Sequence, residues 1–131
     1  MTQAIRFETP FGEVRLGRLE GETIIDAVAA PAVGFDSTPE AWETIRNAAG
    51  KSYALQDVKV LAPINPGKLI AIGLNYQSHV EETNLKHPDA PVVFAKFPSS
   101  ITGPNDTIVI PREETRPDFE GEVGIVICKR G

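Results

Sequence analysis

Three acidic residues alternate with other residues in RPDFEGEVGIVIC, the stretch at 116–128. In an extended strand Asp118, Glu120 and Glu122 point to one face, because side chains alternate with a period of two. Neighbouring carboxylates then lie roughly 6.6 Å apart, and their repulsion at an effective dielectric of about 20 is about 2.5 kcal/mol per pair. Such a cluster needs something that compensates its charge.

Two kinds of partner would compensate these acids. The first is water with nearby cations, so that the acids form a solvated strand end facing Arg112, Arg116 or Lys129. The second is a hard divalent cation such as Mg²⁺, Mn²⁺ or Ca²⁺, because these ions prefer oxygen ligands. The apolar continuation from Val123 to Cys128 favours a strand covered on both faces. Both interpretations stay open at this point.

A histidine and a glutamate form a second polar cluster. His79 and Glu82 are three residues apart, so one turn of helix places them on the same face. A carboxylate beside an imidazole fixes the tautomer and raises the basicity of the ring, as in a general base that deprotonates water. The alternative is a solvated helix, since a His-x-x-Glu pattern also arises by chance. His87 precedes Pro88 in a loop and is interpreted as a surface residue.

The elements that must position these residues begin with a strand-rich segment. Residues 4–29 contain three short strand patterns broken by turns, which predict a small antiparallel meander. A helix is expected next, with Thr38 as its N-cap and Pro39 in its first turn. Trp42 is the expected packing anchor of this helix, which should end before Gly50.

A second unit follows a linker, which the prolines of residues 51–67 indicate. Apolar runs of strand length predict strands at 69–73, 92–96, 107–110 and 118–128, with a turn at 103–106. The predicted fold class is α+β and predominantly β. We expect a small N-terminal β-rich domain with one helix at 1–62 and a second domain at 63–131. The chain stops after its most apolar strand, and such a strand expects neighbours on both sides.

Composition limits the partners and the compartment. The chain has 131 residues, 41% of them hydrophobic, and a formal net charge of −5. Without a basic stripe, such a chain is not attracted to nucleic acid or to an anionic membrane. No signal-peptide pattern is present and no apolar run approaches about 18 residues, so we predict a cytoplasmic protein. The single cysteine, Cys128, excludes an intrachain disulfide and a cysteine-based zinc site.

The order of these motifs resembles the fumarylacetoacetate hydrolase family. The matching pieces are Gly-x-Asn-Tyr-x-x-His-x-x-Glu at 73–82, Pro-x-x-Phe-x-Lys at 91–96, Gly-Pro-x-Asp at 103–106 and Asp-x-Glu-x-Glu-x-Gly-x-Val at 118–126. Each piece is short, but their order and spacing together are specific. The resemblance spans about residues 62–131, and the first 60 residues are loosely similar to the small N-terminal domain of many bacterial members.

The resemblance implies a divalent-metal hydrolase or lyase that acts on C–C bonds of β-diketo or 2-oxo acids. Acylpyruvate or fumarylpyruvate hydrolysis, decarboxylation and isomerisation are the reactions expected, in the catabolism of aromatic or sugar acids. Glu120 and Glu122 match the ligands of Mg²⁺, or of Mn²⁺ or Ca²⁺ in its place. Asp118 matches a neighbour that is not usually counted as a ligand.

The resemblance also implies roles for residues around the predicted general base. His79 and Glu82 match a dyad that prepares water or shuttles a proton. Lys96 matches a candidate contact to a substrate oxygen, and Asn75 and Tyr76 are expected to bind substrate as well.

The segment 79–90 matches a lid that orders over bound substrate, and its composition stabilises no long element. The family's third acidic ligand and a further lysine lie downstream of the matched motifs. We therefore expect a fragment of an enzyme roughly twice as long, homodimeric in its full-length form and inactive as this chain alone, because two carboxylates make a weak Mg²⁺ site.

Two other functions remain open. One is a non-catalytic binding or assembly module, whose acids form a solvated strand end and whose strand edge pairs with another chain. The other is an inactive relative that binds an oxo acid without converting it. Metal-dependent turnover separates the enzyme from both.

Overall fold

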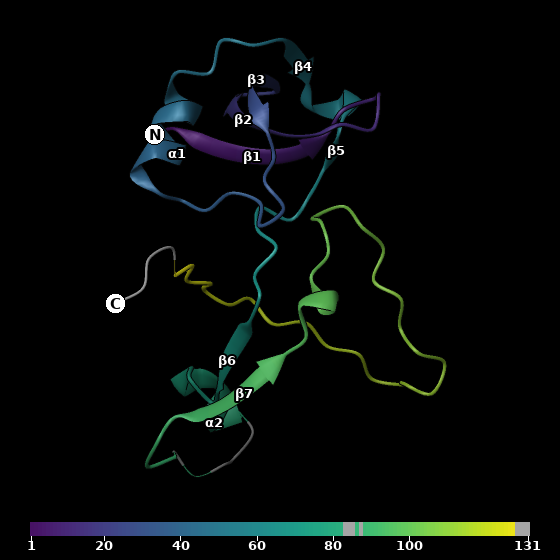
Figure 1. Cartoon of the computed structure of the whole chain (residues 1–131). Helices are drawn as coiled ribbons and strands as arrows, with labels where there is room; N and C mark the ends of the chain where they lie inside the picture. The colour runs from purple at the N-terminus through teal and green to yellow at the C-terminus, as the bar shows by residue number, and fades with distance from the viewer. Residues whose placement is uncertain (83–85, 87, 128–131) are drawn as a thin grey trace. The chain divides into compact units, whose positions relative to one another are not determined.

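A computed structural model describes residues 1–82, 86 and 88–127, without the side chain of His79. The described residues divide into two compact units, Met1–Ile64 with Thr102–Gly131, and Asn65–Ile101. Strands predominate over helices, so the predicted α+β, predominantly β fold class is confirmed (Figure 1). The predicted domains, 1–62 and 63–131, stay a prediction, because contacts define a compact unit but do not show that it folds alone.

The first unit is built on a five-stranded antiparallel sheet with the order β4-β3-β2-β1-β5. Its strands are β1 (Gln3–Glu8), β2 (Val14–Glu20), β3 (Thr23–Ala29), β4 (Ser52–Ala54) and β5 (Lys59–Val60). The predicted meander of three strands is confirmed as β1, β2 and β3. Its turns use Gly12 at φ 82° and Gly21 at φ 59°, a conformation that favours glycine. Alternation in β1 and β3 then buries Ile5, Phe7 and Ile24 in one core cluster.

Helix α1 (Pro39–Arg46) packs a second core cluster, formed by Leu16, Phe35 and Ile45. The Thr38 cap is confirmed, because its side-chain oxygen accepts a hydrogen bond from the backbone N–H of Ala41 at 3.2 Å. Trp42 is confirmed as an anchor, since its ring meets Phe35 edge to face with centroids 4.9 Å apart.

The predicted linker is wrong for part of its length. Ser52–Ala54 and Lys59–Val60 pair with the sheet as its two edge strands, β4 and β5. The first proline of the segment, Pro63, comes only after this pairing has ended, so it does not interrupt it. Residues 55–57 form a short 3-10 helix, η1 (Leu55–Asp57), between the two strands.

The second unit contains the pair of antiparallel strands β6 (Leu69–Gly73) and β7 (Val92–Lys96), and both predicted strands are confirmed. Helix α2 (Gln77–Glu82) lies between them in the sequence. A 3-10 turn, η2 (Pro98–Ser100), follows β7. Among the described residues, none of the helices combines the length and apolar character needed to span a bilayer.

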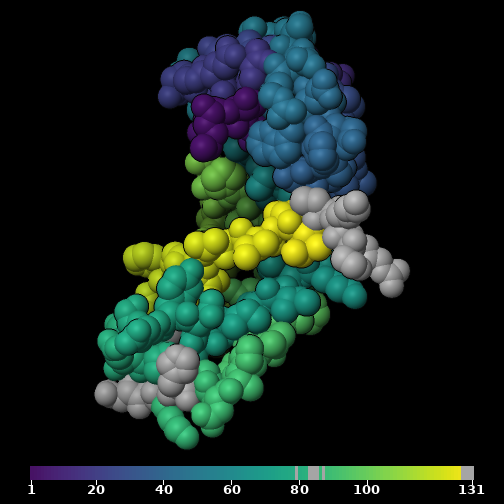
Figure 2. Space-filling model, turned by 90° about the vertical axis from the view of Figure 1, so that its left-hand side faces the viewer, coloured from purple at the N-terminus to yellow at the C-terminus, as the bar shows by residue number. Residues whose placement is uncertain are grey.

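The strands predicted at 107–110 and 118–128 are wrong for the residues that the structure describes, which end at residue 127. The segment 107–127 forms no helix or strand, and the space-filling view shows its later residues in yellow at the surface (Figure 2). The side chains of Phe119 and Val123 are 90% and 81% exposed. Apolar residues alone do not make a strand, because a strand needs a partner for its backbone hydrogen bonds.

We predict that Thr38→Ala lowers the free energy of unfolding by about 1 kcal/mol, because it removes the cap of α1. Thr44→Ala is the matched control, since Thr44 lies inside the same helix and its hydroxyl donates to the carbonyl of Glu40. Alanine has the higher helix propensity, so this variant should be neutral or slightly more stable. Urea unfolding followed by circular dichroism measures both, and equal effects would contradict the cap assignment.

Candidate metal and general-base site

The general-base candidates follow a constrained turn at the end of β6. Leu74 takes φ 54°, in the left-handed region that non-glycine residues rarely adopt. Asn75 and Tyr76 come next and lead directly into α2. The buried side chain of Val80 anchors this helix, whose first turn is closed by a 3.2 Å hydrogen bond from the Val80 N–H to the Tyr76 carbonyl. The turn at Leu74 and the start of α2 therefore determine the backbone path through Asn75 and Tyr76.

Positions 79 and 82 share one face of α2, as the spacing predicts. Glu82 is exposed. The side chain of His79 lies outside the described residues, and so do residues 83–85 and 87 of the predicted lid. The dyad and the lid therefore stay predictions. Glu81, on a different face, accepts a hydrogen bond from Gln77 at 2.9 Å.

Lys96 lies at the far end of β7. In the β6–β7 register it pairs with Leu69, whereas Gly73, next to the turn, pairs with Val92. Four residues of strand separate the two ends, which is about 13 Å along the sheet. The backbone therefore does not bring Lys96 beside Asn75, and a shared contact with one substrate depends on the reach of the lysine side chain.

The two predicted metal ligands lie in the segment 107–127. Glu120 and Glu122 are exposed and two residues apart. The carboxylate of Asp118 accepts a hydrogen bond from the N–H of Phe119 at 2.8 Å. We expect Glu120 and Glu122 to point to one face and to converge near His79, and this stays a prediction.

The donor set fits a hard cation but does not complete its shell. Mg²⁺ is commonly bound by one or two carboxylates together with water and substrate oxygens, and Glu120 with Glu122 supplies that pair. Within the described part of the chain, no three His, Cys, Asp or Glu side chains are grouped so that they would hold a metal ion. These two residues would therefore hold the ion together with oxygens from elsewhere.

Asp106 belongs to the Gly-Pro-x-Asp motif, but no role was predicted for it from the sequence. Its carboxylate lies 2.8 Å from the ammonium of Lys59 and accepts hydrogen bonds from Gly103 and Thr102. These contacts lower the pKa of Asp106 from 3.8 to about 2, with Lys59 as the largest cause. The turn predicted at 103–106 is a sequence signal for the local bonds, whereas no pattern indicates the distant lysine.

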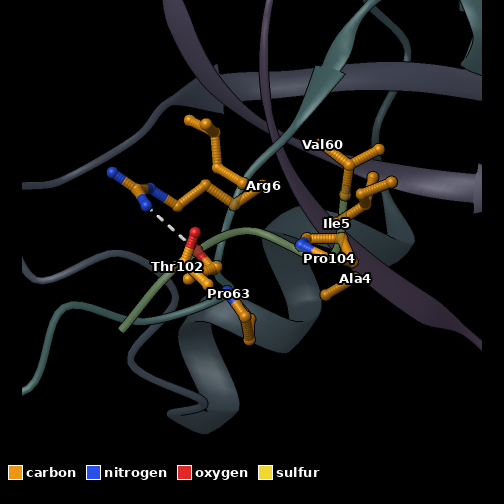
Figure 3. Close-up of a pocket in the computed structure, with 9 residues that line it drawn as sticks. Ala4, Ile5, Arg6, Val60, Pro63, Thr102 and Pro104 are labelled. Carbon is orange, nitrogen blue, oxygen red and sulfur yellow. Dashed lines mark hydrogen bonds between the residues drawn. The ribbon is translucent and has the colours of Figure 1, made fainter. Parts of the chain in front are cut away.

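A groove of about 390 Å³ lies in the first unit, beside this turn (Figure 3). Its walls come from β1, from the end of β5 with the stretch after it, and from Thr102 and Pro104. Across it, Arg6 donates to the carbonyl of Ala62 at 2.9 Å. Among the residues that the structure describes, its lining includes none of the predicted site residues.

Sequence comparison finds a family model described as fumarylacetoacetate (FAA) hydrolase C-terminal, which matches residues 68–131. A fumarylacetoacetate hydrolase domain-containing protein 2 homolog from Dictyostelium discoideum is 37% identical over 129 residues, covering 88% of this chain and 42% of that protein. The protein named oxaloacetate tautomerase Fahd2a, mitochondrial, from Rattus norvegicus is 41% identical over 100 residues, covering 70% of this chain and 32% of that protein.

Two solved structures are also similar. An uncharacterized protein from Mycobacterium abscessus has a TM-score of 0.59 at 32% identity, covering 88% of this chain and 40% of that one. The protein Cg1458 has a TM-score of 0.60 at 29% identity, covering 86% of this chain and 38% of that one. The chain thus spans less than half the length of each of these four proteins.

We predict that Glu122→Ala in the full-length protein abolishes Mn²⁺ binding in calorimetry, because one remaining carboxylate leaves the ion with too little charge and too few ligands. Glu113→Ala is the control, since Glu113 is an exposed glutamate of the same segment. It should bind Mn²⁺ like the wild type. Equal binding by all three proteins would remove Glu122 as a ligand.

Proposed function

Residues 68–131 of this chain belong to the fumarylacetoacetate hydrolase family, and from that premise we propose a divalent-metal enzyme that interconverts the keto and enol forms of a 2-oxo acid such as oxaloacetate. The observation that carries the substrate is the 41% identity to a protein named as an oxaloacetate tautomerase. The observation that supports the chemistry is α2, which places positions 79 and 82 on one face.

The proposed reaction moves one proton. His79 removes a proton from C3 of the keto acid, the electron pair of that C–H bond forms the C2–C3 double bond, and the C2 oxygen takes up a proton. Glu82 would accept a hydrogen bond from the other ring N–H of His79. This hydrogen bond would hold the imidazole in the tautomer whose unprotonated nitrogen faces the substrate. In the reverse direction the same residues return the proton to C3, so no atom is gained or lost.

Charge develops on the C2 oxygen as the C–H bond breaks. Glu120 and Glu122 would hold the divalent ion, Mg²⁺ or in its place Mn²⁺ or Ca²⁺, and when bound this ion supplies a Lewis acid that offsets the developing charge. Asn75 and Tyr76 follow β6 closely and would donate hydrogen bonds to the substrate carboxylates. Lys96 would contribute a positive charge.

A second candidate uses the same residues for C–C cleavage. In acylpyruvate or fumarylpyruvate hydrolysis, the dyad of His79 and Glu82 activates water, and the ion stabilises the enolate that leaves. Family membership favours this chemistry, whereas the similarity to a named tautomerase favours the enol step alone. The two candidates differ in whether water is consumed.

The full-length protein is the setting of this proposal, because the chain spans less than half of its relatives. We propose a homodimer that binds a small oxo acid and has no nucleic-acid or membrane partner. The cytoplasmic location stays a prediction, since the tautomerase compared above is named as mitochondrial.

An assay of the full-length protein with the enol form of oxaloacetate tests the proposal. The decay of the enol is followed by its ultraviolet absorbance. EDTA should abolish the catalysed part of the decay and Mn²⁺ should restore it. Acylpyruvates assayed in parallel report hydrolysis. Catalysis that EDTA leaves unchanged would contradict the metal, and no turnover of any of these acids would favour the non-catalytic module or the inactive relative.

We predict that His79→Ala keeps Mn²⁺ binding but loses a factor of about 10² to 10⁴ in turnover, which is the usual contribution of a general base. Glu82→Ala should also lose turnover, because the imidazole is no longer oriented. Glu81→Ala is the matched control, since Glu81 is the neighbouring glutamate of the same helix. Full activity in His79→Ala, or equal losses in the two glutamate variants, would contradict the dyad.

A further inference from the structure

The carboxylate of Asp106 joins two parts of the chain that are distant in sequence. Its Oδ1 lies 2.8 Å from Nζ of Lys59, the first residue of β5. Its Oδ2 accepts hydrogen bonds from the N–H of Gly103 at 2.8 Å and from the hydroxyl of Thr102 at 3.0 Å. One side chain therefore closes its own turn and at the same time binds the edge of the sheet.

The turn also lies directly against the backbone of β5. Gly103 is buried, and a Cβ atom added to it would lie 2.8 Å from the carbonyl oxygen of Val60, closer than real Cβ atoms come. β5 is fixed in turn, because it pairs with β1 and the N–H of Leu61 donates to the carbonyl of Arg6 at 2.9 Å. Figure 3 shows Thr102 and Pro104 beside residues of β1 and of the stretch after β5.

The segment that carries Glu120 and Glu122 starts at this turn. Between residues 107 and 119 the hydrogen bonds join near neighbours, such as the N–H of Arg116 and the carboxylate of Glu114 at 2.7 Å. No helix or strand forms within 107–127. The turn is therefore the place where the start of this segment is tied to the sheet.

We propose that Asp106 is a positioning residue, which with Lys59 locks the turn 102–106 onto β5 and so fixes the start of the segment that bears Glu120 and Glu122. We call these contacts the Asp106 clasp. The clasp gives the N-terminal sheet a role, because the sheet becomes the base from which the ligand segment extends. Only the link to metal binding rests on the proposed function.

The charge state of the clasp is constant near neutral pH. The pKa of Asp106 is lowered to about 2 by Lys59 and by the hydrogen bonds from Gly103 and Thr102. The pKa of Lys59 is raised, chiefly by Asp106, with a smaller contribution from Glu8 opposite it on β1. The pKa of Asp106 in the folded protein lies below its ordinary value of 3.8. The clasp therefore contributes its full stabilisation of the fold above pH 3.8, and this contribution is lost as the pH falls through about 2.

Four variants of the full-length protein test the clasp. Lys59→Met removes the ion pair, Lys59→Arg keeps it, and Gly103→Ala pushes the turn away from β5. Gly67→Ala is the matched control, because a Cβ atom there meets nothing within 4 Å. Hydrogen exchange is read at residues 103–122 without metal, and the affinity for Mn²⁺ is then read by calorimetry.

In Lys59→Met we expect exchange at residues 103–122 to accelerate about threefold and the affinity for Mn²⁺ to fall by a similar factor, as suits a partly exposed ion pair. Gly103→Ala should show larger changes, while Lys59→Arg and Gly67→Ala should match the wild type. Unchanged exchange in both Lys59→Met and Gly103→Ala would overturn the clasp.

The measurement of Mn²⁺ affinity distinguishes a failure of the clasp from a failure of the proposed function. If exchange accelerates while the wild type binds no Mn²⁺, the clasp holds and the metal site fails. If exchange accelerates but the affinity of a metal-binding wild type is unchanged in Lys59→Met and Gly103→Ala, Asp106 is not a positioning residue for Glu120 and Glu122.

Discussion

The pairing of backbone hydrogen bonds decides what each apolar run of this chain becomes. β1 has β2 on one side and β5 on the other, so its alternating residues can bury Ile5 and Phe7. The short runs 108–110 and 123–127 are also apolar, yet they form no strand and their side chains are largely exposed. Strand propensity in this chain is therefore realised only where a partner strand is present.

The same constraint explains how much of the fold the sequence could predict. Period-two alternation, the turn glycines and the Thr38 cap are local signals, and they predicted β1, β2, β3 and α1. β5 has only two residues, and its pairing with β1 depends on a distant strand, so no local pattern indicated it. For the described residues 118–127 the pattern was correct as a propensity but wrong as a structure, because alternation says nothing about whether a partner exists.

In the candidate site, too, local features could be predicted from the sequence, whereas features that depend on distant segments could not. The spacing of His79 and Glu82 needs only a helix, and α2 supplies it. The opposite placement of Lys96 and Gly73 comes from the register of β6 and β7, which the motif order does not contain. Lys59 was unpredictable as a partner of Asp106, since an ion pair between distant segments exists only once both are folded.

Electrostatic interactions explain how the proposed enzyme would work. Glu120 and Glu122 place two like charges two residues apart, an arrangement that a divalent ion would make favourable. That ion would offset the charge of an enolate, while the imidazole of His79 would move the proton. Asp106 would hold the start of the ligand segment on the sheet through a charge that does not change near neutral pH. The most direct measurement is anomalous scattering from Mn²⁺ in crystals of the full-length protein with oxalate bound. The account predicts a peak within about 2.0 to 2.6 Å of carboxylate oxygens from both Glu120 and Glu122, and a peak that neither carboxylate touches would contradict it.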